Sequence, residues 1–134
     1  MIWKAWRQFR ARRARREFFK LLALEISQNL ETCYIIQQLG QLRPFDLRVW
    51  QQAAKLPNLL WPREILIYVE RLTEFNSALR VAQEYEQWYS SNLDNQSHDN
   101  AQLLHAHKES AQEKFVGLEL IIKNAQPSLE QFKK

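Results

Sequence analysis

Three histidines fall within ten residues of one another, and histidine is the commonest protein ligand for transition metals. They are His98, His105 and His107. Two ligands on one helical face need a spacing of three or four residues, whereas His105 and His107 are two apart and point about 160° away from each other. The Glu-x-x-His sequence of four-helix di-iron proteins does not occur. We therefore predict neither a metal site nor a bound cofactor.

The other chemistry-bearing residue types are sparse. Cys33 is the only cysteine, so no intramolecular disulfide can form, and its place on an apolar helical face favours packing over catalysis. Gly40 and Gly117 are the only glycines, too few for a glycine-rich phosphate loop. No catalytic residue is predicted, and the chain is interpreted as a protein without enzymatic activity.

The strongest signal is the opening stretch, MIWKAWRQFRARRARREFF, where basic and aromatic residues alternate. Residues 1–20 carry eight Lys or Arg against the single Glu17, for a net charge of +7, while the remaining 114 residues sum to −3. Such an asymmetry indicates an anionic partner. The sequence predicts a basic-aromatic arm over residues 1–17, continuous with the first helix of a bundle domain over residues 18–134.

A helical projection divides the arm into two parts. The apolar tip occupies one sector of about 120°; its members are Ile2, Trp3, Trp6 and Phe9. Farther along, Arg10, Arg13 and Arg16 return to that sector, and the other arginines point elsewhere. The arginine collar therefore surrounds the helix on all sides; its members are Arg7, Arg10, Arg12, Arg13, Arg15 and Arg16.

These residue types favour attachment to an anionic membrane surface. Tryptophan prefers the membrane interface, and each cation near an anionic leaflet contributes about 1 kcal/mol. The tip residues would serve as the apolar anchor, and the predicted contacts to anionic groups are Lys4, Arg7, Arg10, Arg12, Arg13, Arg15 and Arg16. Because the collar is not confined to one face, the helix is expected to dip its tip obliquely into the membrane.

Four alternatives stay open. An arginine-rich helix contacted on several sides suits structured RNA, with Trp3 or Trp6 stacking on a base. The arm can instead dock into a protein groove, with Trp3, Trp6 and Phe9 as anchors. It also resembles a cleaved mitochondrial presequence, although it has no serine before Ser27. The fourth alternative is that the arm only extends the first helix into solvent.

The elements that would carry the arm are helical. From Phe18 the apolar residues share one face, which predicts a core-facing helix ending near Gly40; they are Phe18, Phe19, Leu22, Ile26, Leu30, Cys33 and Ile36. A short helix fits Asp46–Leu56, and Pro62 is placed for the first turn of a long helix. On that helix, Asn76 interrupts the apolar seam between Leu72 and Leu79, which predicts a buried hydrogen bond that fixes helix register.

The loop SSNLDNQSHDN separates this helix from a last long one. Asp99 and Gln102 resemble a capping box at its start, Lys108 interrupts its apolar seam, and Pro127 should end or kink it. No alternating run predicts a strand. We predict an all-α fold, a small antiparallel helical bundle of three long helices plus a short one, with an Arg-rich N-terminal helical extension.

The sequence also indicates where the protein works. Its longest uncharged stretch, TCYIIQQLGQL, has eleven residues, whereas a helix that crosses a bilayer needs about 20. The basic start is followed by LLALEIS rather than by a sustained apolar run, unlike a secretory signal. We therefore expect a protein that is cytoplasmic, not secreted, and peripheral to the membrane, acting as an adaptor whose bundle can also contact a protein partner.

Overall fold

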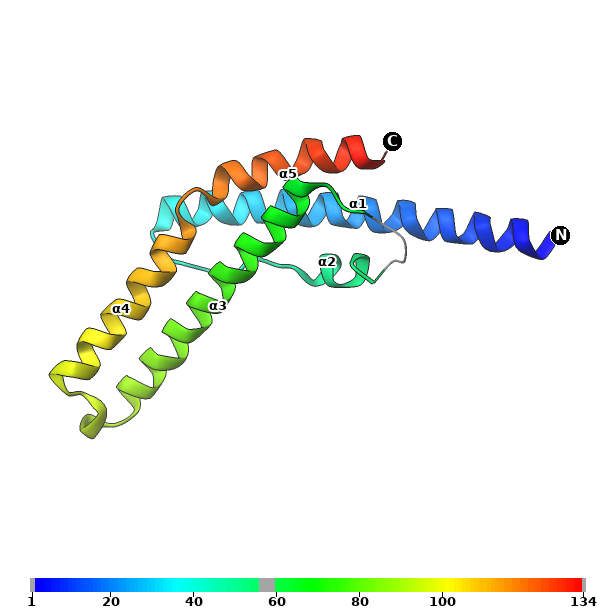
Figure 1. The fold of residues 1–134 in the computed structure, drawn as a ribbon. Helices are drawn as coiled ribbons and strands as arrows, with labels where there is room; N and C mark the ends of the chain where they lie inside the picture. Colours follow the sequence, from blue (N-terminus) through cyan, green and yellow to red (C-terminus); the bar gives the residue numbers. More distant parts are fainter. Residues whose placement is uncertain (1, 56–59, 134) are drawn as a thin grey trace.

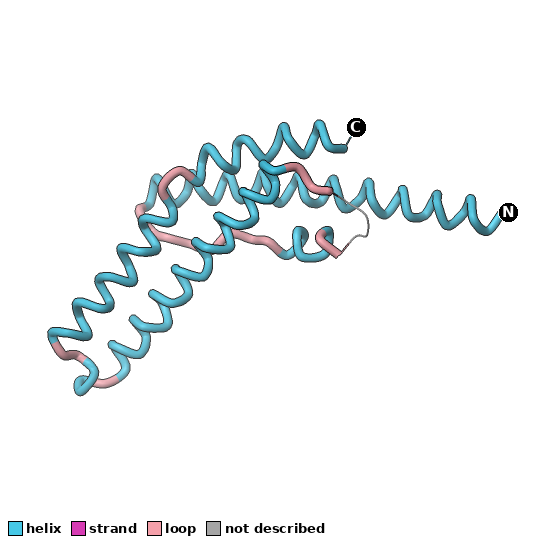
Figure 2. The backbone as a smooth tube through the Cα atoms, in the orientation of Figure 1, coloured by secondary structure: helices cyan, strands magenta, loops and turns pink. Residues whose placement is uncertain are grey.

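The computed structural model describes residues 2–55 and 60–133, and in these ranges it contains helices and loops but no strand (Figures 1 and 2). The helices are α1 (Ile2–Leu39), α2 (Arg48–Ala53), α3 (Arg63–Ser91), α4 (His98–Phe115) and α5 (Leu118–Lys133), with a 3-10 turn, η1 (Leu93–Asn95), between α3 and α4. The predicted all-α class is confirmed. The short helix ends at Ala53, and the predicted end at Leu56 lies outside the described residues.

Helices α1 and α5 lie side by side and antiparallel, and α3 packs against α5 and, along its length, against α4 (Figure 1). The core forms where these helices meet, and it begins at Phe19 on α1. Its buried members are Phe19, Leu22, Ile26, Cys33, Ile36, Phe45, Ile65, Tyr68, Leu72, Phe75, Leu79, Leu118, Ile122, Ala125 and Leu129. Two parts project from this core, the N-terminal end of α1 and the hairpin of α3 and α4.

The last predicted helix is divided in two at Gly117. This glycine has φ +83°, a left-handed conformation in which the chain turns out of the direction of α4. The turn lets α4 stay on α3 while α5 crosses to α1 (Figure 2). Apolar periodicity continues across the break from Phe115 to Leu118, so periodicity alone did not reveal it.

Replacing Gly117 by alanine should lower the free energy of unfolding by about 1 to 2 kcal/mol, because a Cβ in the left-handed region clashes with its own backbone. No other atom lies within 4 Å of the position of that Cβ, so the loss measures backbone strain alone. Urea unfolding checks the value. Gly117→Asn is the matched control, since asparagine tolerates this conformation better. A larger loss for asparagine than for alanine would contradict the explanation.

Pro127 does not end the last helix, because α5 continues through it to Lys133. Proline removes one backbone hydrogen bond, but its position on the exposed side of α5 leaves the freed carbonyl of Lys123 in reach of water. Beyond the proline, Leu129 is buried in the core and Phe132 packs edge-on against Phe19. These contacts hold the segment after Pro127 in the helix.

Helix α4 begins two residues earlier than predicted, because Ser97 rather than Asp99 caps it. The Ser97 hydroxyl accepts a hydrogen bond from the Asn100 backbone N–H at 3.1 Å, and the residue has an extended conformation with φ −79° and ψ 163°. Serine is a favoured N-cap because its short side chain reaches the unpaired N–H groups of the first turn. His98 is therefore the first residue of α4 and does not lie in the loop.

In the seam between α3 and α4, His107 provides the packing contact that the apolar pattern lacks at Lys108. The imidazole of His107 packs on the ring of Tyr85 with centroids 5.1 Å apart. Lys108 lies beside the seam, and its Nζ forms an ion pair with Glu86 across the two helices at 3.0 Å. The seam is thus continuous across the position that the sequence pattern left open.

Polar side chains of α1 and α3 hold the connector between α1 and α2, residues 40–47, to the bundle. Asn29 donates to the Asp46 carbonyl at 2.8 Å and to the Tyr68 hydroxyl at 2.7 Å, and its Oδ1 accepts from the Asp46 N–H at 2.9 Å. Asn76 of α3 bonds both backbone groups of Phe45, at 2.8 and 2.9 Å. The hydrogen bonds predicted for Asn76 therefore exist, but they fix the connector rather than the register of two helices.

Glu25 of α1 caps α2 from outside that helix. Its carboxylate accepts hydrogen bonds from the backbone N–H groups of Val49 and Trp50, at 2.8 and 3.1 Å, in the first turn of α2. Burial raises the pKa of this carboxyl, and the two N–H donors act in the opposite direction. Beside it, hydrogen bonds from Arg48 lower the pKa of Asp46 to about 2. The Glu25 carboxylate thereby fixes the position of α2 against α1, and the Asp46 carboxylate holds Arg48 at the start of α2.

Candidate functional site

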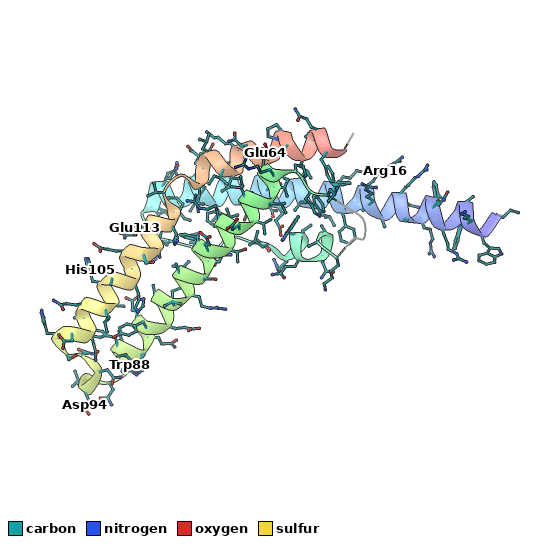
Figure 3. The ribbon with its side chains drawn as sticks, viewed as in Figure 1. Arg16, Glu64, Trp88, Asp94, His105 and Glu113 are labelled. Carbon is teal, nitrogen blue, oxygen red and sulfur yellow. The ribbon has the colours of Figure 1, made fainter. Side chains whose placement is uncertain are left out.

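The arm is a continuous helix that extends α1 beyond the core (Figure 3). Every side chain from Ile2 to Glu17 is exposed. Trp3 is 70% and Trp6 48% exposed, so neither ring is buried on the protein's own bundle. At 1.5 Å per residue, the segment from Ile2 to Glu17 is about 24 Å long. The arm therefore exposes its apolar and its basic side chains together, outside the core.

The structure brings part of the apolar tip together. The rings of Trp3 and Trp6 meet edge to face with centroids 6.2 Å apart, and Ile2 lines a small apolar hollow with them. The Arg10 guanidinium lies over the Trp6 ring, 4.4 Å from its centroid. A cation at this distance is attracted by the negative face of the indole. Tip and collar thus overlap at this turn, where one helical face carries both an aromatic ring and a charge.

Phe9 is separated from the tryptophans by one turn and lies among charges. It lines a shallow hollow with Arg12, Arg13, Arg16, Glu17 and Lys20. Within the described part of the chain, the recorded ion pairs include none of the collar arginines; the nearest is Lys20 with Glu17 at 3.9 Å. The guanidiniums and Lys4 are left exposed to water, available to anionic groups of a partner.

The base of the arm is anchored by aromatic rings. Phe19 packs edge to face against Trp61, with centroids 5.8 Å apart, and against Phe132 at 5.7 Å. Trp50 of α2 also meets Trp61, at 5.1 Å. This cluster joins four separate segments of the chain around the point where α1 leaves the core. It fixes the direction in which the arm projects.

The histidines have three different partners and do not converge. His98 Nε2 lies 3.1 Å from the Gln102 side chain, His105 lies 3.0 Å from the Glu109 carboxylate, and His107 packs on Tyr85. Among residues 2–55 and 60–133, no group of three or more potential ligand side chains has the arrangement needed for a metal ion. The described helices also include none that is long and apolar enough to cross a membrane.

Cys33 is fully buried on α1, as its place on the apolar face predicted. Burial raises the pKa of its thiol to about 11, chiefly because the thiolate loses its hydration there. Since the thiolate is the nucleophile, alkylation at pH 8 should be at least about a hundredfold slower in the folded chain than in urea. Ser90→Cys, at an exposed position of α3, is the internal control. Equal rates for the two cysteines in the folded chain would contradict this.

Sequence reasoning missed Glu25 and Asn29, which are 3% and 1% exposed. A signal was present for Asn29, which lies inside the angular range of the apolar face that starts at Phe18, whereas Glu25 lies about 20° outside the edge of that range at 100° per residue. Among the described residues, no buried side-chain nitrogen or oxygen is left without a hydrogen-bond partner. These two polar groups are therefore fully used in holding the fold.

Comparison of the chain with protein-family models, with curated proteins and with solved structures finds no match in any of the three.

Proposed function

We propose that the protein is a non-enzymatic adaptor whose arm attaches the helical bundle to an anionic membrane surface. The observation that carries the proposal is the exposure of Trp3 and Trp6 at the end of an arm that carries seven basic side chains. Indole rings in water are unfavourable, whereas the membrane interface accepts both their apolar body and their N–H group. Anionic lipids concentrate in the cytoplasmic leaflet, which makes that leaflet the expected surface.

The arrangement of the arm favours an oblique insertion. The tip lies within the first three turns, and the collar follows it toward the bundle. A helix lying flat would place the arginines of its apolar sector, such as Arg13, in the hydrocarbon, where a charge is costly. With the tip inserted at an angle, the collar reaches the depth of the lipid phosphates on all sides. Guanidinium groups bind phosphate oxygens with two parallel hydrogen bonds, so this depth suits them.

The packed bundle holds the base of the arm in a fixed position. The aromatic cluster around Phe19 and Trp61 holds the root of α1, and Glu25 and Asn29 tie α2 and the connector to the same helix. The direction of the arm is therefore set by the core. A partner protein bound to the bundle would be held at a defined distance from the lipid.

Vesicle sedimentation tests the proposal. The full chain should pellet with vesicles of mixed phosphatidylserine and phosphatidylcholine and stay in solution with phosphatidylcholine alone. A chain lacking residues 1–16 should stay in solution with both, and its core should be intact because no side chain among residues 2–16 is buried. Absence of binding by the full chain to anionic vesicles would overturn the proposal.

RNA is the second candidate, and the collar favours it. Guanidiniums on every side of a helix suit a groove that encloses the helix better than a planar surface does. If RNA is the partner, the affinity for an RNA stem-loop should fall with salt, at a log-log slope of up to about −0.7 for each single-strand phosphate contacted. A slope near zero would exclude RNA, as would a slope unchanged after the collar arginines are replaced.

A further inference from the structure

The hairpin of α3 and α4 carries an exposed apolar face of its own. We define the distal hairpin as residues 81–113, from Val81 on α3 through η1 and most of α4 to Glu113 (Figure 3). Three of its large apolar side chains are about half exposed: Val81 at 43%, Trp88 at 46% and Leu103 at 50%. The packing of α3 on α4 does not require these side chains to be exposed. Exposed apolar side chains that lie together are typical of a surface that binds a partner.

These side chains belong to one continuous face. Tyr85 packs on Trp88 with ring centroids 5.4 Å apart and on His107 of α4 at 5.1 Å, so the rings bridge the two helices. Val81 lies one turn before Tyr85, and Leu103 lies one turn before His107, at the i, i+4 spacing that places residues on the same side of a helix. The hairpin apolar face is therefore Val81, Tyr85, Trp88, Leu103 and His107.

The surroundings of this face are acidic. The distal hairpin has six carboxylates and one lysine, Lys108, for a net charge of −5; the acids are Glu84, Glu86, Asp94, Asp99, Glu109 and Glu113. Among the described residues, the recorded ion pairs use only Glu86, with Lys108, and Glu109, with His105. A ligand for this surface should combine aromatic side chains with positive charge, because apolar contact and charge complementarity then act together.

The same chain carries a segment of that chemistry. Over residues 2–17 the arm has seven basic side chains, one acidic residue and the apolar tip. The arm cannot reach the distal hairpin of its own chain, since α1 points it away from the core on one side and the hairpin leaves on the other (Figure 1). Complementary surfaces at opposite ends of one molecule can be satisfied only between molecules, in a heterologous contact.

We propose that the distal hairpin binds the arm of a second copy of this chain. Trp3 and Trp6 of one copy pack on the Trp88 and Leu103 side of the next, and the collar lies among the hairpin carboxylates. This contact does not depend on the membrane role proposed above. An arm that is not bound to a membrane would bind the distal hairpin of a second copy. Anionic lipid and the second copy would therefore compete for the same residues of the arm.

Sedimentation velocity of the full chain over a concentration series tests this. The mean mass should rise above that of the monomer with concentration at low salt, and the apparent dissociation constant should rise at least tenfold at about 0.5 M salt, where charges are screened beyond about 4 Å. Two variants each lose one side of the contact. The arm variant carries Trp6→Ala, Arg10→Glu and Arg13→Glu, and the hairpin variant carries Glu84→Lys, Trp88→Ala and Asp99→Lys.

Each variant alone should stay monomeric, and an equimolar mixture should form a one-to-one dimer, since the arm variant keeps its hairpin and the hairpin variant keeps its arm. This regained association shows that both variants are folded. The charge-matched control Glu31→Lys with Glu130→Lys changes exposed acids on α1 and α5 and should associate like the wild type. Monomers throughout, or a mixture that stays monomeric, would overturn the proposal.

Vesicle binding separates this inference from the proposed function. The hairpin variant should bind anionic vesicles at least as well as the wild-type chain, because its arm is unchanged. If self-association fails while vesicle binding holds, only the present proposal is overturned; if vesicle binding fails while the mixture dimerises, only the membrane proposal is overturned.

Discussion

Neutralising the last four arginines of the collar should reduce the partition of the full chain onto anionic vesicles about a thousandfold. The substitutions are Arg12→Gln, Arg13→Gln, Arg15→Gln and Arg16→Gln. Each cation near an anionic leaflet contributes about 1 kcal/mol, and the four together contribute about 4 kcal/mol, or about three powers of ten in the partition coefficient. Titration of vesicles at fixed protein concentration measures it. The helix should persist, since glutamine is a good helix former.

The matched control removes the same charge from exposed positions elsewhere on the chain. Its substitutions are Arg43→Gln, Lys55→Gln, Arg63→Gln and Arg80→Gln. If binding depends on the place of the charges, this variant should bind within about tenfold of the wild-type chain, because charges farther than a Debye length of about 8 Å from the lipid are screened at physiological salt. Equal losses in the two variants would show that net charge alone drives binding.

Replacing Asn29 by alanine should lower the free energy of unfolding by about 3 kcal/mol, the largest effect we expect from a polar substitution. Asn29 is 1% exposed and joins three segments, because it bonds both backbone groups of Asp46 and the Tyr68 hydroxyl. The substitution leaves these groups without their partner in or near the core, and each buried unsatisfied group costs about 1 to 3 kcal/mol. Urea unfolding followed by circular dichroism measures the change.

Gln28→Ala is the control, because Gln28 is the neighbour of Asn29 on α1 and its side chain is exposed. An exposed substitution to alanine in a helix should change stability by less than about 0.5 kcal/mol. A loss below 1 kcal/mol for Asn29→Ala would mean that water replaces its hydrogen bonds. The connector between α1 and α2 would then be held mainly by Asn76 and by the burial of Phe45.

The all-α class was predictable because helical periodicity reports which side of a helix is buried. The apolar face that starts at Phe18 identified Cys33 and Ile36 as core residues, and both are buried. The same pattern could not show that the side chains of Glu25 and Asn29 are buried and hydrogen-bonded to other segments of the chain. Apart from the Tyr68 hydroxyl, their partners are backbone atoms of Asp46, Val49 and Trp50, which no side-chain pattern encodes.

Two other differences have local causes. At Gly117, one left-handed residue redirects the chain without interrupting the apolar repeat, so a continuous helix was predicted where α4 and α5 meet. At His107, the imidazole ring of a polar residue packs against the ring of Tyr85. In both cases the deciding quantity, a backbone angle or a ring contact, depends on the packed structure.

For the arm, the residue types and the helical projection predicted a helical extension with its apolar tip on one side, and the structure adds that this helix is free of the core. Trp3 and Trp6 share a face as the projection predicted, and they meet edge to face. The cation that lies over Trp6 is Arg10, which the projection placed in the same sector.

Quenching of the tip tryptophans by brominated lipid tests the central claim most directly. Bromine in the upper acyl chain of an anionic lipid quenches only indoles that enter the membrane. The wild-type chain should lose fluorescence on such vesicles, and a Trp3→Phe, Trp6→Phe variant, which binds through the same collar, should not, since its remaining tryptophans lie on the bundle and the hairpin. Equal quenching of the two chains, or no quenching of either while both bind, would contradict insertion of the tip.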